Sequence, residues 1–159
     1  MARILTVIFI VIVIPSAAMA GTAKVLAVYD GDSLKVEMQG EALSIKLYGI
    51  DAPESGQAGN VSATRFLKHL AAGLPVEVEV VGEDGFGQPL AVLTRKDRKL
   101  SINASIVANG YAWVKPSECH IKDCQEMKAL ESQARMLKLG IWSNFDAVPP
   151  WEFKERHNR

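Results

Sequence analysis

The stretch KVLAVYDGDSLKVEM, residues 24–38, decides the fold. Its first half is apolar and rich in β-branched residues, and its second half alternates apolar with polar residues from Leu34 to Met38. Both patterns are typical of β-strands, and the Asp-Gly step at residues 30–31 is a strong signal for a tight turn. The stretch therefore predicts a β-hairpin whose turn is acidic.

The rest of the chain continues this pattern with further strands and with helices. Alternation of apolar and polar residues predicts three more strands, at residues 43–47, 76–80 and 90–94. Helical spacing of apolar residues predicts three helices, at residues 60–72, 102–108 and 126–139, and the proline-containing segment 149–151 is expected to be extended. This order predicts a mainly β, α+β fold: a five-stranded Greek-key barrel of the oligonucleotide-binding (OB) kind with three helices.

Composition favours one compact domain, residues 21–159, with no internal repeats or linkers. The 159 residues include 18 basic and 18 acidic side chains and are 48% hydrophobic, which excludes a disordered chain. Because the charges balance, the whole molecule cannot attract nucleic acid electrostatically. Any polyanion that it handles must be held locally.

The N-terminal 20 residues have the pattern of a signal peptide. Arg3 precedes an apolar run at residues 4–14, and Ala18-Met19-Ala20 matches an A-x-A cleavage site. The alternative, a membrane anchor, needs about 20 apolar residues, and this run is much shorter. We therefore expect cleavage near Ala20, export to the periplasm or the medium, and no stable membrane anchor.

The two cysteines, Cys119 and Cys124, lie close together in a polar stretch. Export into an oxidising compartment favours a local disulfide between them. The alternative is a zinc site, but the only nearby additional ligand is His120, which is too few for four-fold coordination.

Four acidic residues in two short segments suggest metal-assisted chemistry. Asp30 and Asp32 flank the first turn, and Asp51-Ala52-Pro53-Glu54 directly follows the third predicted strand. A hard cation such as Ca²⁺ prefers oxygen ligands, which Asp32, Asp51 and the carbonyl of Ala52 could supply. Glu54 would then be free to orient or deprotonate a water that attacks a phosphodiester. Mg²⁺ or Mn²⁺ would also accept these ligands.

At these residues the chain resembles the staphylococcal nuclease (thermonuclease-like) family. The resemblance covers nearly all of the chain after residue 20 and is carried by VYDGDS at 28–33, LYGIDAPE at 47–54, GQPLA at 87–91, IN at 102–103, ANGYAW at 108–113 and LGIW at 139–142. It implies an OB-type barrel with three helices and a Ca²⁺-dependent endonuclease that cuts DNA and RNA. Secreted bacterial members also have a similar cysteine pair and a similar closing PWEF, here at residues 150–153.

Matched position by position, the resemblance implies that Asp32, Asp51 and the Ala52 carbonyl bind calcium and that Glu54 handles the attacking water. The family's two phosphate-binding arginines are replaced here by Lys46 and Gln88. Arginine grips two phosphate oxygens at once, whereas lysine is a flexible point charge and glutamine carries none. Reduced activity is therefore expected. The basic turn at residues 95–99 could reach a phosphate instead, although a solvated loop is the simpler interpretation.

Two functional hypotheses follow from these residues. The preferred one is a secreted, monomeric, Ca²⁺-dependent nuclease acting on DNA or RNA, in which Glu54, Lys46 and Gln88 face the substrate. The alternative is a catalytically inactive OB module that binds nucleic acid, another polyanion or a protein. Three tryptophans could stack on bases, but we expect them to serve packing: Trp113, Trp142 and Trp151.

Overall fold

The structure is a computed structural model that describes residues 19–157. The predicted signal peptide lies outside the described residues except for Met19 and Ala20. Strand β1 (Ala20–Val28) begins at Ala20, and the Met19 carbonyl accepts a hydrogen bond from the amide of Val80 at 2.9 Å. Within the described range, no helix has both the length and the apolar character needed to cross a bilayer.

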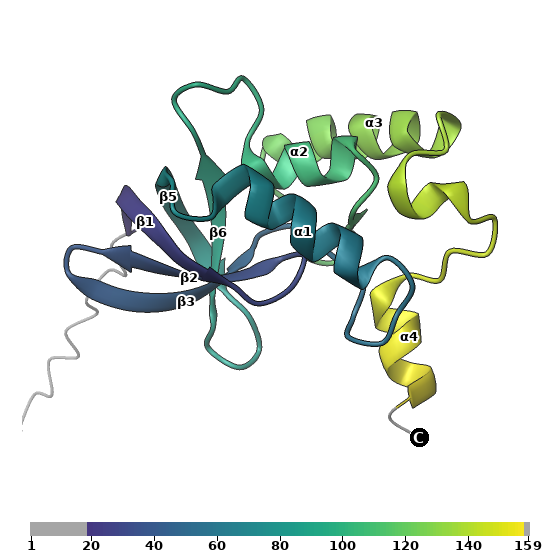
Figure 1. The fold of residues 1–159 in the computed structure, drawn as a ribbon, viewed down its shortest axis with the longest axis horizontal. Helices are drawn as coiled ribbons and strands as arrows, with labels where there is room; N and C mark the ends of the chain where they lie inside the picture. Colours follow the sequence, from purple (N-terminus) through teal and green to yellow (C-terminus); the bar gives the residue numbers. More distant parts are fainter. Residues whose placement is uncertain (1–18, 158–159) are drawn as a thin grey trace, which may run out of the picture.

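Five strands close into a barrel in the order β1-β2-β3-β6-β5, which confirms the predicted OB-type barrel (Figure 1). The strands after β1 are β2 (Ser33–Met38), β3 (Glu41–Leu47), β5 (Pro75–Glu83) and β6 (Pro89–Thr94). All neighbours are antiparallel except β3 and β6, which run parallel where Lys46 pairs with Leu90. A parallel pair needs a long crossover, which α1 and β5 provide.

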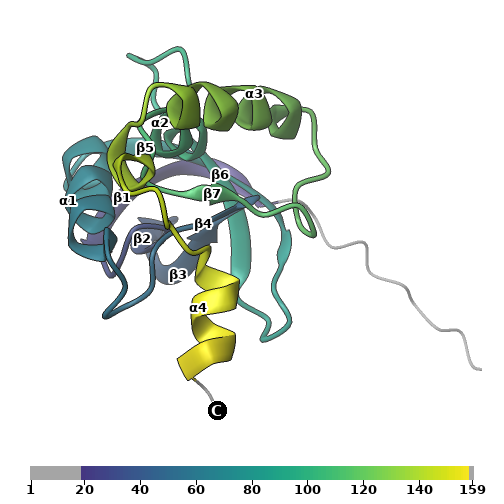
Figure 2. The same cartoon turned by 90° about the vertical axis from the view of Figure 1, so that its right-hand side faces the viewer.

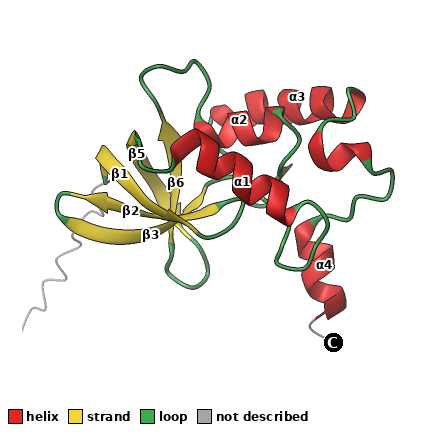
Figure 3. Cartoon of the chain, viewed as in Figure 1, coloured by secondary structure: helices red, strands yellow, loops and turns green. Residues whose placement is uncertain are grey.

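The three predicted helices are present, and they lie together on one side of the strands (Figure 3). They are α1 (Asn60–Ala71), α2 (Ile102–Ala108) and α3 (Asp123–Met136). The predicted end of α3 at residue 139 was wrong, because Lys138 adopts a left-handed backbone with φ of 53°. A short 3₁₀ turn, Gly140–Ser143, follows.

A further helix, α4 (Pro150–His157), closes the described chain, so the extended tail expected around residue 150 was wrong. Proline is tolerated in the first turn of a helix, where its missing amide has no helical partner in any case.

Two very short strands, β4 (Ile50–Asp51) and β7 (Trp113–Val114), form a separate antiparallel pair. These contacts matter because β4 carries Asp51.

The alternating apolar residues of the strands fill the barrel interior. Leu34, Ile45 and Leu93 have no exposed surface, and Leu67 of α1 closes the same core. A smaller cluster at the C-terminal end contains Trp113 and Trp142, whose rings meet edge to face at 5.0 Å. Burial of both rings agrees with the packing role expected for them.

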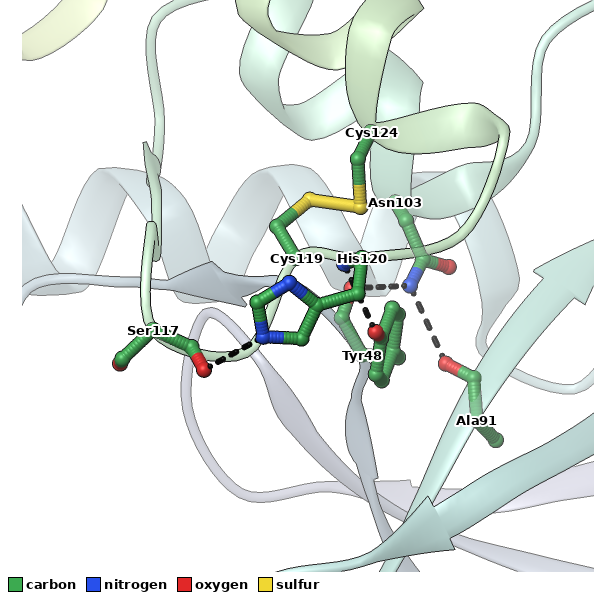
Figure 4. The surroundings of a disulfide bond; sticks show 7 residues. All are labelled: Tyr48, Ala91, Asn103, Ser117, Cys119, His120 and Cys124. Atoms are coloured by element: carbon green, nitrogen blue, oxygen red, sulfur yellow. Dashed lines mark hydrogen bonds between the residues drawn. A yellow bond between two sulfur atoms is a disulfide. The ribbon is translucent and has the colours of Figure 1, made fainter.

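The predicted disulfide between Cys119 and Cys124 is present (Figure 4). It packs over Gly49, where an added Cβ would lie 2.9 Å from the Cys119 Sγ atom. The Tyr48 hydroxyl accepts a hydrogen bond from the His120 amide at 3.0 Å, and the Tyr48 carbonyl accepts one from the buried Asn103 side chain at 3.1 Å. The bridge therefore fixes the turn that leads from β3 into β4.

Candidate active site

The acidic turn between β1 and β2 directs Asp32 into the protein. Asp30 Oδ1 accepts hydrogen bonds from the amides of Asp32 at 3.0 Å and Ser33 at 2.7 Å, which closes the turn. Gly31 is required because an added Cβ would lie 2.6 Å from the Cβ of Ala52. The turn thus does more than reverse the chain, since it packs directly against the segment that follows β4.

Asp32 is 5% exposed, and both of its carboxylate oxygens have partners. Oδ1 accepts a hydrogen bond from the Ser33 hydroxyl at 2.9 Å, and Oδ2 accepts one from the Ala52 amide at 2.8 Å. The second bond ties the hairpin to the Asp51–Ala52 segment across 20 residues of sequence. Two of the three predicted metal ligands are therefore fixed relative to each other by a direct hydrogen bond.

Asp51 is 3% exposed, and its Oδ1 atom has no hydrogen-bond partner among the described residues. Its backbone is held by the pairing with Trp113 in the β4–β7 ladder. The nearest cation is the Lys154 ammonium of α4, 3.7 Å from Oδ1. A buried carboxylate oxygen without a hydrogen bond is costly, so this atom requires an electrostatic partner.

The electrostatics of the two aspartates agree with that need. Burial, together with the charges of Asp30 and Asp51, raises the pKa of Asp32 to about 7, although Lys46 and the Ala52 amide oppose the rise. Burial also raises the pKa of Asp51, against the charges of Lys154 and Lys46. Two neighbouring buried carboxylates disfavour each other's ionised form, and a bound cation would remove that conflict.

Glu54 sits in a loop that is held at several points. Its amide donates to the Gln57 side chain at 2.9 Å, and Asn60 donates to the Pro53 carbonyl at 2.7 Å. The Glu54 side chain is 33% exposed and forms an ion pair with Lys154, Oε1 to Nζ at 2.8 Å. The loop thus fixes the Glu54 backbone, the Lys154 ion pair orients the carboxylate, and the partial exposure lets a water reach it.

Lys46 of β3 and Gln88, in the loop just before β6, lie at the same end of the barrel. Lys46, near the end of β3, pairs with Ser33 of β2 and with Leu90 of β6. Its charge lowers the pKa of both Asp32 and Asp51, so it belongs to the carboxylate cluster. Gln88 lies just before β6, in a loop that is closed by its own amide donating to Asp84 at 2.9 Å.

Sequence reasoning missed two cations of this cluster, Lys154 and Lys115. Lys115 contributes to lowering the pKa of Asp51, and its ammonium is bound to Glu118. Lys154 follows the PWEF segment, but nothing in the local sequence indicates that the tail returns to the carboxylates.

The basic turn at residues 95–99, which could have reached a phosphate, follows the opposite end of β6. There Arg95 is bound to Asp97 at 2.7 Å.

The available oxygen ligands fit a hard cation that takes only part of its coordination shell from the protein. Among residues 19–157, no three His, Cys, Asp or Glu side chains gather closely enough to enclose a metal ion. Asp32, Asp51 and the Ala52 carbonyl would therefore supply part of the oxygen shell, and water or a phosphate oxygen would complete it. The fit is supported by Asp51 Oδ1, which has no hydrogen-bond partner in the described part of the chain.

Comparison with known proteins agrees with this architecture. Residues 44–144 match the family model described as "Staphylococcal nuclease homologue". A protein described as an uncharacterised endonuclease from Escherichia coli O157:H7 is 35% identical over 84% of each chain. A micrococcal nuclease from Shigella flexneri is 31% identical over 82% of this chain and 79% of its own. A thermonuclease from Staphylococcus hyicus is 28% identical over 77% of this chain and 76% of its own. The chain belongs to the family of staphylococcal nuclease homologues.

Proposed function

We propose that this protein is an exported, Ca²⁺-dependent nuclease that hydrolyses phosphodiester bonds of DNA and RNA. The observation that carries the proposal is the cluster of Asp32, Asp51 and Glu54 at one end of the barrel, in which a buried oxygen of Asp51 has no hydrogen bond from any residue that the structure describes. The relatives described as endonuclease, micrococcal nuclease and thermonuclease support the same class of substrate.

Each residue of the cluster has a chemical role in the proposal. Asp32, Asp51 and the Ala52 carbonyl hold the cation, which when bound supplies positive charge against the phosphate. Glu54 orients a water and accepts its proton, because its carboxylate is partly exposed and its backbone is held by the Gln57 side chain. Lys46 contributes positive charge where charge develops on the phosphate.

Cation-dependent cleavage is the direct test. The purified protein is incubated with single-stranded and plasmid DNA in millimolar Ca²⁺ or in chelator. We expect cleavage in Ca²⁺ and none in chelator, because the buried aspartates, whose pKa values are raised by burial, would bind the cation that supplies positive charge at the phosphate. DNA that stays intact under both conditions would contradict the nuclease and favour a binding module.

The phosphate contacts give a second prediction. Gln88 carries no charge, and its loop lies beside the strand pair that carries Lys46. Gln88→Arg is therefore expected to raise the cleavage rate by about 10-fold or more, since one electrostatic contact to the reacting group commonly contributes on the order of 10² to 10³. The measurement is the initial rate on single-stranded DNA. A restored arginine that leaves the rate unchanged would count against a phosphate near Gln88.

Export is proposed from the N-terminal pattern of Arg3, the apolar run and the Ala18-Met19-Ala20 step. Cleavage after Ala20 would remove the Ala20–Glu79 pair of the β1–β5 ladder and leave the pairs from Gly21 onward. The barrel can therefore close without the signal peptide. The intact mass of the protein recovered from the periplasm or medium is expected to correspond to a chain that starts at Gly21 with the disulfide formed.

A further inference from the structure

We infer that Lys154, near the C-terminus of the chain, is a phosphate-binding residue of this active site. The inference rests on the proposed nuclease function and adds to it a cation from the tail of the chain. It is carried by one juxtaposition: the Lys154 ammonium lies 2.8 Å from Glu54 Oε1 and 3.7 Å from Asp51 Oδ1, between the two carboxylates.

The placement of Lys154 is built into the fold. The Gln57 side chain accepts a hydrogen bond from the Glu54 amide and donates one to the Val148 carbonyl at 2.6 Å. One residue thus joins the Glu54 loop to the segment that leads into α4, and the first residue of that helix, Pro150, is buried. Figure 2 shows α4 near β4, and the ion pair between Lys154 and Asp51 joins these two elements. The tail is anchored at the site rather than resting on it by chance.

Among the described residues, the other cations of the cluster leave room for a second phosphate contact beside Lys46. Lys115 is neutralised by Glu118, and Lys46 approaches from β3, on the side of Asp32 and Ser33. Lys154 is the cation in direct contact with Glu54. In the proposed reaction Glu54 handles the water that attacks the phosphate, so the phosphate must lie close to Glu54 and therefore close to Lys154. Its side chain is 41% exposed, which leaves it accessible to a ligand.

The chemistry of lysine suits a change of partner. An ammonium on a four-carbon stem is a mobile point charge, and it can turn from a carboxylate to a phosphate oxygen without moving the helix. A cation on Asp51 would compete with Lys154 for Oδ1 and so favour that change. Lys154 then adds positive charge to a site in which Gln88 has none, while Gln57 still holds the Glu54 backbone.

The test compares Lys154→Gln with a matched control on the same helix. Lys154→Gln keeps most of the aliphatic stem and removes the charge. Arg156→Gln removes an equal charge from α4, but Arg156 faces solvent and pairs with Glu152 at 3.3 Å. Both variants are first checked for an unchanged thermal unfolding midpoint. Lys154→Arg is added as the conservative variant.

The first measurement is binding, which does not depend on turnover. A fluorescent single-stranded phosphorothioate oligonucleotide keeps the charge of DNA and resists cleavage. Its affinity in Ca²⁺ is measured over a range of salt concentrations. For Lys154→Gln we expect weaker binding. We also expect the plot of log affinity against log salt concentration to be less steep by about 0.7, the value for one lost phosphate contact on a single strand. Arg156→Gln and Lys154→Arg should keep the slope of the unmodified protein.

The second measurement is DNA cleavage, where Lys154→Gln is expected to lose about 10-fold or more and Lys154→Arg to retain most of the activity. Equal salt slopes for Lys154→Gln and Arg156→Gln would overturn the inference, as would faster cleavage by Lys154→Gln, which would mean that the lysine blocks the site. If the unmodified protein binds but never cleaves, the proposed nuclease fails, and the salt slope still decides whether Lys154 contacts phosphate.

Discussion

Replacing Glu54 by glutamine is expected to abolish cleavage, with a loss of about 10² to 10⁴ in rate, the usual contribution of a general base. Glutamine has nearly the same shape and keeps the loop, because the Gln57 and Asn60 bonds involve backbone atoms of residues 53 and 54. What it removes is the ability to accept a proton from water. The measurement is the initial rate on single-stranded DNA in Ca²⁺.

Two controls separate this chemistry from other effects of the substitution. Glu155→Gln removes a carboxylate from an exposed position of α4 and should leave the rate unchanged. Lys154→Gln breaks the same ion pair but leaves the Glu54 carboxylate in place, so its loss should be clearly smaller. A Glu54→Gln variant that keeps more than about a tenth of the activity would show that another group handles the water.

Local patterns were sufficient to predict the barrel and most of its elements. Alternation located the strands, and helical spacing placed α2 at residues 102–108, as found. The Asp-Gly turn and the bridge between Cys119 and Cys124 also follow from neighbouring residues. These features are decided within a few residues, where backbone geometry and short loops leave few alternatives.

The features that were missed depend on contacts between distant parts of the chain. The parallel pairing of Lys46 with Leu90 and the β4–β7 pair involve too few residues to leave a periodic signal. The helical tail was misjudged because prolines were expected to keep it extended, although Pro150 is compatible with a first helical turn.

The candidate site likewise has parts that local sequence predicts and parts that depend on contacts between distant residues. The acidic segments at Asp32 and Asp51 were visible, and the fold places them in direct contact through the Ala52 amide. Gly31 matters more than the sequence indicated. A tight turn alone would explain a glycine there, but Gly31 also packs against Ala52 so closely that a side chain would not fit. Lys154 could not be found, because its position depends on the Gln57 bond to Val148, 91 residues away. The candidate site is thus assembled from segments that lie far apart in the sequence.

Replacing Asp51 by asparagine should lower stability in calcium but not in its absence. Without a cation, the folded protein buries a carboxylate whose pKa is raised, so its ionised form at neutral pH disfavours folding. Stability from this group is present at low pH and is lost as the pH rises past the folded pKa. Asparagine removes that cost, and in chelator at pH 8 the variant is expected to unfold at the same or a higher temperature.

In calcium the variant should instead unfold at a lower temperature than the unmodified protein. A ligand that binds only the folded state stabilises it by about 2.7 kcal/mol at 100 times its dissociation constant, which raises the melting temperature by several degrees for a domain of this size. Asp51→Asn loses a charged ligand at the buried Oδ1 position, so this rise and the Ca²⁺-dependent cleavage should both disappear. Asp97→Asn is the matched control, since that carboxylate pairs with Arg95 beyond the opposite end of β6. If Asp51→Asn still gained stability from calcium as the unmodified protein does, the cation would lie elsewhere, and the unpartnered oxygen would be neutralised by Lys154 alone.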